Sequence, residues 1–140
     1  MGPERQAANS SGRASVDTSI VKRFDNPEKV LVFDQGRLEL ITVGGRAIGK
    51  GSYSPGWRWS RRAAAPTSAR GGLPEHVGVV LAGRAKVLIH QGSEIDLYPG
   101  DFFHITAEDE DDEWVVGYRP CEILYLSGVE AMIKELHRPE

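Results

Sequence analysis

The chain has 140 residues, 40% of them hydrophobic and 26% charged, which is the balance of one globular domain with a real core. A formal net charge of −3 argues against a nucleic-acid-binding face, and the single cysteine, Cys121, excludes an internal disulfide or a CxxC motif. No apolar run approaches the ~20 residues of a membrane span and no signal peptide is recognisable, so we expect a cytoplasmic protein without nucleic-acid or membrane partners.

The first 19 residues are rich in Ala, Ser, Asn, Gly and Arg and contain almost no bulky apolar side chains. Such a segment cannot bury enough surface to offset its ordering entropy, so we predict a disordered tail over 1–19 and a folded domain over 20–140. Within that domain, Asn26-Pro27 has the pattern of a helix N-cap followed by proline at the first helical position. A short helix is therefore predicted over residues 27–33.

The next part of the chain has the pattern of a β protein. Short runs rich in β-branched and aromatic residues are separated by turn residues such as Gly44-Gly45 and Pro99-Gly100. The predicted strands are 38–43, 47–53, 77–81, 85–90, 94–97, 102–105, 114–118 and 123–126. Eight short strands at this spacing predict a sandwich or barrel, and residues 129–137 have helical character and close the domain.

Two motifs carry a resemblance to a known family. Residues 76–87 form an apolar run with a glycine turn at Gly83, which resembles the first conserved motif of cupins. Residues 97–105 contain a Pro-Gly-Asp turn and resemble the start of the second motif. Shorter matches elsewhere extend the similarity to small single-domain bacterial cupins over about residues 22–128. The resemblance implies an all-β cupin (jelly-roll) barrel with a short N-terminal helix and a C-terminal helix, and a homodimer.

The metal ligands of cupins are largely missing at the matching positions. The resemblance places the His-x-His pair at Arg70 and Gly72, the glutamate at His76, and the second-motif histidine at Asp111. The more similar group has a ligand histidine at the position of Arg62. Arginine stays protonated and glycine has no side chain, so neither can ligate. We therefore predict no metal and no cofactor.

A different set of metal ligands is the alternative, because His104 could join His76 and Asp111. A metal-dependent dioxygenase or isomerase would then be possible. On the metal-free interpretation, the opposite charges of Arg62 and Asp111 could pair and fill the vacated space. The acidic run 108–113 is interpreted as a solvated loop at the barrel mouth.

His76 is the candidate catalytic residue, since a histidine that points into the barrel can transfer protons near neutral pH. The competing interpretation is a core histidine satisfied by a neighbour. For the aromatic residues the alternatives are an aromatic wall around a flat ligand or ordinary core packing. Candidate ligand-binding residues are Trp57, Trp59, Arg62, His104, Asp111, Trp114 and Tyr125.

These observations favour a barrel that binds a small organic molecule without a metal. The chemistry could be non-redox: isomerisation, cyclisation, dehydration or decarboxylation. Two alternatives are the metal-dependent enzyme and a non-catalytic sensory barrel. The sequence does not separate these three functions, because pocket shape depends on side-chain directions.

Overall fold

The computed structural model describes residues 19–61, 73–89, 92–106 and 112–136, so most of the predicted tail lies outside the described part. Among those residues, no helix is long and apolar enough to cross a membrane. In chain order the elements are β1 (Lys29–Phe33), β2 (Gly36–Val43), β3 (Arg46–Tyr53), the 3₁₀ turn η2 (Trp59–Arg61), β4 (His76–Ala82), β5 (Arg84–Leu88), β6 (Glu94–Leu97), β7 (Phe102–Ile105), β8 (Asp112–Val116), β9 (Cys121–Ser127) and α1 (Val129–Leu136).

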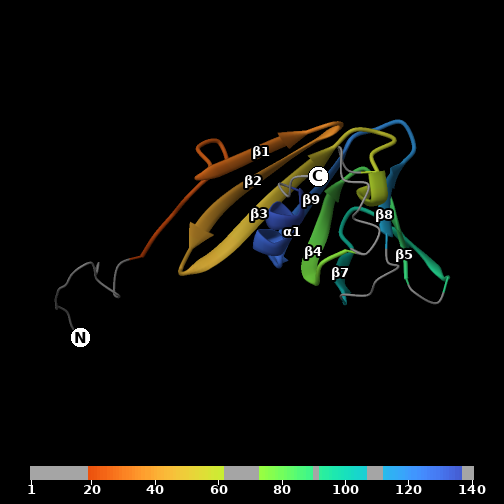
Figure 1. Ribbon diagram of the computed structural model, residues 1–140. Coiled ribbons are helices and arrows are strands. Elements are labelled where there is room, and N and C mark those ends of the chain that lie inside the picture. Colours follow the sequence, from red (N-terminus) through yellow and green to blue (C-terminus); the bar gives the residue numbers. More distant parts are fainter. Residues whose placement is uncertain (1–18, 62–72, 90–91, 107–111, 137–140) are drawn as a thin grey trace.

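The strands form two antiparallel sheets (Figure 1). The larger sheet has the order β1-β2-β3-β9-β4-β7 and the smaller has the order β6-β5-β8. Several consecutive strands lie in different sheets, so the chain crosses between the sheets at β4–β5, β6–β7, β7–β8 and β8–β9. A further link is the hydrogen bond from Val115 N–H to Trp57 O, 2.9 Å long, which joins the segment after β3 to β8.

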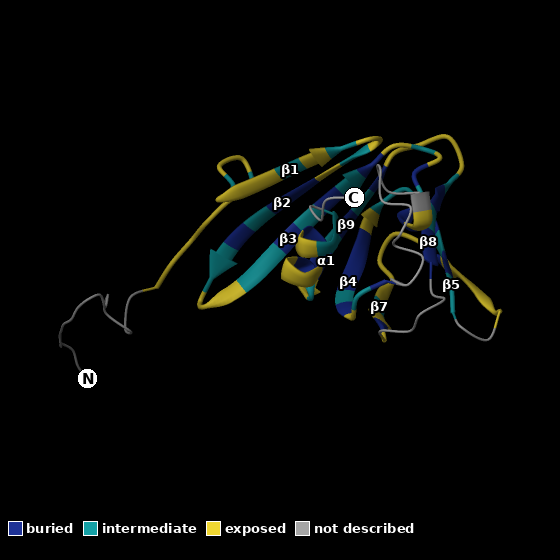
Figure 2. Ribbon diagram, in the orientation of Figure 1, coloured by how far each residue is buried: buried dark blue, intermediate teal, exposed yellow. Residues whose placement is uncertain are grey.

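The hydrophobic core fills the space between the sheets and continues under α1. Buried residues follow β2 and β4 in particular (Figure 2). The helix buries Val129, Met132 and Ile133. It can approach β3 closely because Gly49 has no side chain; a Cβ there would lie 2.3 Å from Val129 Cγ2. The predicted C-terminal helix is confirmed, and all eight predicted strands are present as β2 to β9.

The predicted N-terminal helix is wrong. Residues 29–33 form strand β1, which pairs antiparallel with β2 from Lys29↔Leu40 to Phe33↔Gly36. The Asn26-Pro27 signal marks a turn, and the following Lys-Val-Leu-Val-Phe run is rich in residues that favour strands. Pairing with β2 satisfies the backbone of this segment, so the helix propensity of the cap is overridden. The all-β fold class is confirmed.

Gly83 lies in the sharp turn between β4 and β5, and we predict that Gly83→Ala destabilises the fold strongly. Its φ is +77°, and a Cβ would lie 2.3 Å from Pro120 O, a backbone atom. Gly92 is the matched control, with φ +84° and no atom within 4 Å of a Cβ. Gly92→Ala should cost only the conformational term, about 1–2 kcal/mol, in urea unfolding. Equal losses for the two variants would contradict the account.

Candidate functional site

His76 is the first residue of β4, and it points into the space between the sheets, where it is fully buried. Its Nδ1 lies 2.7 Å from Pro74 O. A carbonyl oxygen can only accept, so Nδ1 carries the proton and donates it. In the neutral ring, Nε2 is then a free acceptor. The backbone of the preceding segment therefore fixes both the ring orientation and the tautomer.

Glu113 on β8 lies across the core from His76, with Oε1 3.8 Å from His76 Nε2. Both side chains are 0–1% exposed. Among the described residues, neither Nε2 nor either carboxyl oxygen has a hydrogen-bond partner. A buried polar group left unpaired costs about 1–3 kcal/mol, and such groups are rare in folded proteins. Three of these atoms at one place mark a site adapted to something other than stability.

Burial keeps both groups neutral near pH 7. Loss of solvation and, to a smaller extent, the neighbouring Asp112 charge together raise the pKa of Glu113 from 4.5 to about 8. Loss of solvation lowers the pKa of His76, although the hydrogen bond to Pro74 opposes this. The pair is therefore a carboxylic acid facing a neutral imidazole, and it is not an ion pair. One member can donate a proton while the other accepts one.

Aromatic rings surround this pair. His76 meets Tyr125 and Phe103 edge to face, with ring centroids 5.5 and 5.7 Å apart. The Tyr125 hydroxyl lies 2.6 Å from that of Tyr53, and both are buried. The ring of Trp57 stacks on Tyr53 at 4.2 Å. These rings carry few polar groups, namely the hydroxyl pair and the Trp57 indole N–H. Their largely apolar surface explains the strong desolvation of Glu113 and His76.

The two tryptophans from the segment after β3 belong to the same core. Trp57 and Trp59 are both buried, and their rings meet edge to face at 6.4 Å. They extend the aromatic cluster that includes Tyr53. Whether they also contact a ligand stays a prediction.

Trp114 and His104 lie apart from the buried pair. Strand alternation turns Trp114 away from the side on which Glu113 lies, and Arg58 covers its ring at 4.1 Å. The side chain of His104 is half-exposed, and Nε2 lies 2.8 Å from Glu75 Oε2. The structure therefore brings together His76, Tyr125 and the two buried tryptophans, but not these two side chains.

Arg62 and Asp111, the pair predicted to fill the vacated space, lie outside the described residues. Within the described part of the chain, an ion pair of the same kind forms between Arg58 and Asp112. Asp112 Oδ2 accepts from Arg58 Nε at 2.7 Å, and Oδ1 accepts from Ser60 N–H at 3.0 Å. These two contacts connect the segment after β3 to the start of β8.

The interpretation of residues 108–113 as a solvated acidic loop is wrong for its last two members. Asp112 and Glu113 belong to β8 and are buried; residues 108–111 lie outside the described part. Glu113 was missed because it ends a run of six carboxylates. Alternation would have found it, since Glu113 shares a face with Val115, and Val115 belongs to the core.

The described residues do not provide the set of metal ligands that the cupin resemblance implies. Catalytic metal sites use three or more protein ligands. Within the described part of the chain, no three His, Cys, Asp or Glu side chains come together as a metal cluster. His76 and Glu113 supply two donors, and the carboxyl group is protonated near neutral pH.

Comparisons with known proteins identify the fold. No protein-family model matches the chain, and neither does any curated protein. Among solved structures, the polyketide cyclase RemF from Streptomyces resistomycificus matches with a TM-score of 0.55 and 15% identity, over 77% of this chain and 78% of the cyclase. An oxalate decarboxylase from Lactobacillus farciminis matches with a TM-score of 0.51 and 17% identity, over 79% of this chain and 34% of the decarboxylase. Both have the cupin fold, and so does this chain.

The buried carboxylic acid makes stability depend on pH. In the unfolded chain Glu113 ionises above its ordinary pKa of 4.5, whereas the folded protein keeps the proton until about pH 8. Unfolding therefore releases this proton in that window, so the contribution of Glu113 to the free energy of unfolding falls as pH rises. His76, whose pKa is lowered in the folded state, contributes in the opposite sense below its ordinary pKa of 6.5. We predict that the free energy of unfolding of the wild type minus that of Glu113→Gln falls between pH 5 and 8, measured by urea unfolding at each pH.

A matched control is Glu94→Gln, which changes an exposed carboxylate on β6. Its free energy of unfolding should follow the wild-type curve above pH 5. Parallel pH curves for the wild type and Glu113→Gln would show that Glu113 ionises normally in the folded state.

Proposed function

We propose that this cupin-fold protein binds a small carbonyl compound between its sheets and catalyses non-redox proton transfer on it without a metal. The observation that carries the proposal is the buried pair of neutral groups, His76 Nε2 as acceptor and Glu113 as donor, 3.8 Å apart. Proton transfer by positioned side chains is most efficient when their pKa values lie near the working pH. The raised pKa of Glu113 and the lowered pKa of His76 leave each in the form that its role needs.

The chemistry is an enolisation. Glu113 donates its proton to the carbonyl oxygen while His76 Nε2 removes a proton from the adjacent carbon. The C–H electron pair forms the new C=C bond, and the C=O π pair binds the proton from Glu113. The product is an enol, flanked by an imidazolium and a carboxylate whose opposite charges stabilise each other in an apolar surrounding. Return of a proton to a different carbon gives isomerisation, and attack by the enol carbon gives cyclisation.

Two cupin-fold neighbours act on carbonyl-containing molecules by their names. One cupin-fold neighbour is a polyketide cyclase and another is an oxalate decarboxylase. At 15% and 17% identity these names indicate only that the fold can host chemistry on carbonyl-containing molecules. The choice of reaction depends on the His76–Glu113 pair of this chain.

We further propose that the protein forms a homodimer and lies in the cytoplasm.

The test is hydrogen exchange at carbon. Wild-type protein in D₂O should accelerate deuterium incorporation next to the carbonyl in at least one of cyclohexanone, pyruvate and acetylacetone, followed by NMR. His76→Ala should lower the rate at least about 100-fold, because the base is gone. Glu113→Gln should lower it about 10-fold or more, because an amide is a weaker proton donor. The rate should fall above about pH 8, where Glu113 ionises, and below the lowered pKa of His76.

Glu94→Gln, an exposed carboxylate on β6, is the control and should exchange like the wild type. Exchange that is no faster with wild type than with the His76→Ala, Glu113→Gln double variant, on every ketone, would reject the proposal.

A further inference from the structure

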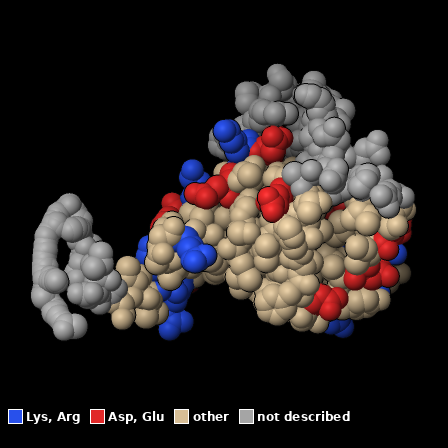
Figure 3. All heavy atoms as spheres, turned by 90° about the horizontal axis from the view of Figure 1, so that it is seen from below, with Lys and Arg blue, Asp and Glu red and all other residues tan. Residues whose placement is uncertain are grey.

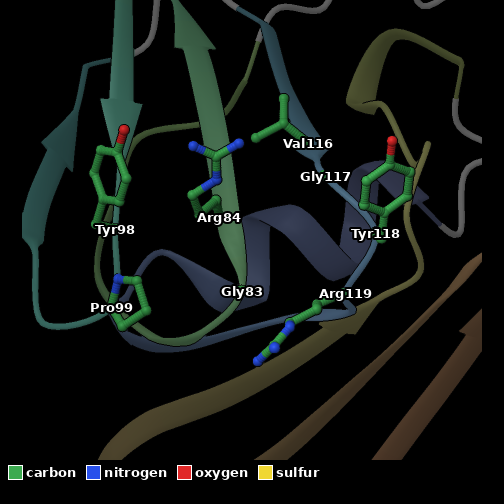
Figure 4. Close-up of a pocket in the computed structure, with 8 residues that line it drawn as sticks. All are labelled: Gly83, Arg84, Tyr98, Pro99, Val116, Gly117, Tyr118 and Arg119. Atoms are coloured by element: carbon green, nitrogen blue, oxygen red, sulfur yellow. The ribbon is translucent and has the colours of Figure 1, made fainter.

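A second pocket opens on the surface where three turns meet (Figure 4). They are the β4–β5 turn at Gly83, the β6–β7 turn at Tyr98-Pro99, and the β8–β9 turn at residues 117–119. Its volume is about 380 Å³, within the range of small-molecule sites. All of the lining residues are described, and none of them belongs to the site discussed above.

This pocket is far from the buried pair. His76 begins β4, and Gly83 directly follows the last residue of that strand. A strand rises about 3.3 Å per residue, so the two places are roughly 20 Å apart along β4. A ligand in one would not touch the other.

The charged side chains that line the pocket are all positive. Arg84 and Arg119 line it, and no carboxylate does. Within the described part of the chain, neither guanidinium forms an ion pair. Other basic side chains do: Lys86 lies 3.2 Å from Asp96, and Arg37 lies 3.1 Å from Glu39. On the face drawn in Figure 3, acidic and basic side chains are interspersed. Two unpaired guanidinium groups at one pocket are therefore available to an anion, and their planar forks suit a carboxylate.

The pocket also offers flat aromatic surfaces. Figure 4 shows Tyr98 and Tyr118 on opposite sides, with Arg84 between them. Tyr98 is 46% exposed and Tyr118 is 98% exposed, so both rings present faces to solvent. The Arg84 guanidinium already lies 5.5 Å from the Tyr98 ring centre. Gly117 lies beside Arg84 and has a φ of +85°. A Cβ at this position would lie 3.9 Å from a guanidinium nitrogen of Arg84, so the lack of a side chain at Gly117 leaves space next to that group.

We propose that this pocket is a separate binding site for a small aromatic carboxylate. The ring stacks against Tyr98 and Tyr118, and the carboxylate accepts hydrogen bonds from Arg84, with Arg119 adding positive charge. The proposal is independent of the proton-transfer chemistry of His76 and Glu113. Either could hold without the other.

The probe is 2-naphthoate, compared with its uncharged analogue 2-naphthamide, by titration calorimetry and by NMR of backbone amides. Wild-type protein should bind 2-naphthoate at least 10-fold more tightly than the amide. The amide shifts should centre on the turns at Gly83, Tyr98 and Tyr118. Arg84→Gln should weaken binding of 2-naphthoate at least 10-fold, and Arg119→Gln should weaken it by a smaller factor.

The control is Arg46→Gln, an exposed arginine at the start of β3 that does not line the pocket. It should bind 2-naphthoate like the wild type. The proposal is overturned if acid and amide bind equally, or if both pocket arginine variants bind like the wild type. It is also overturned if the shifts map onto β4 near His76 and onto β8 near Glu113, which would assign the probe to the barrel interior.

Discussion

The arrangement depends on one constraint, the burial of Glu113 opposite His76 in an apolar core. A carboxylate in this position would be an uncompensated buried charge, so the group keeps its proton at neutral pH. Loss of solvation also lowers the pKa of His76, so the imidazole stays neutral. Desolvation thus gives a donor and an acceptor on facing strands, without any charge of their own until a proton moves.

The two-sheet architecture places these groups on different sheets. His76 stands on β4 of the larger sheet, whereas Glu113 stands on β8 of the smaller one. The hydrogen bond to Pro74 fixes the imidazole, and the Arg58–Asp112 pair holds the start of β8 next to Glu113. The distance between the two proton-transfer groups is therefore set by how the sheets pack. The aromatic residues around the pair set the local dielectric.

Most of the fold could be predicted from the sequence, because strand length, β-branched composition and turn residues are local properties. The exception was residues 27–33, where a local capping signal competed with pairing to β2, and the non-local pairing determined the structure. The site was harder. His76 can be found from the sequence because it begins the apolar strand that leads to the recognisable glycine turn at Gly83. Glu113 was not found, because its burial depends on where the acidic run ends and β8 begins, which is a property of the tertiary fold.

The central claim is that Glu113 is a protonated acid near neutral pH, and the most direct test is its own titration. The measurement is the ¹³C shift of the Glu113 side-chain carboxyl, followed by NMR from pH 4 to pH 9 in selectively labelled protein and assigned with Glu113→Gln. The account predicts a midpoint at about pH 8. A midpoint near the ordinary glutamate pKa of 4.5 would mean that Glu113 is ionised at neutral pH, and the neutral donor–acceptor pair would not exist.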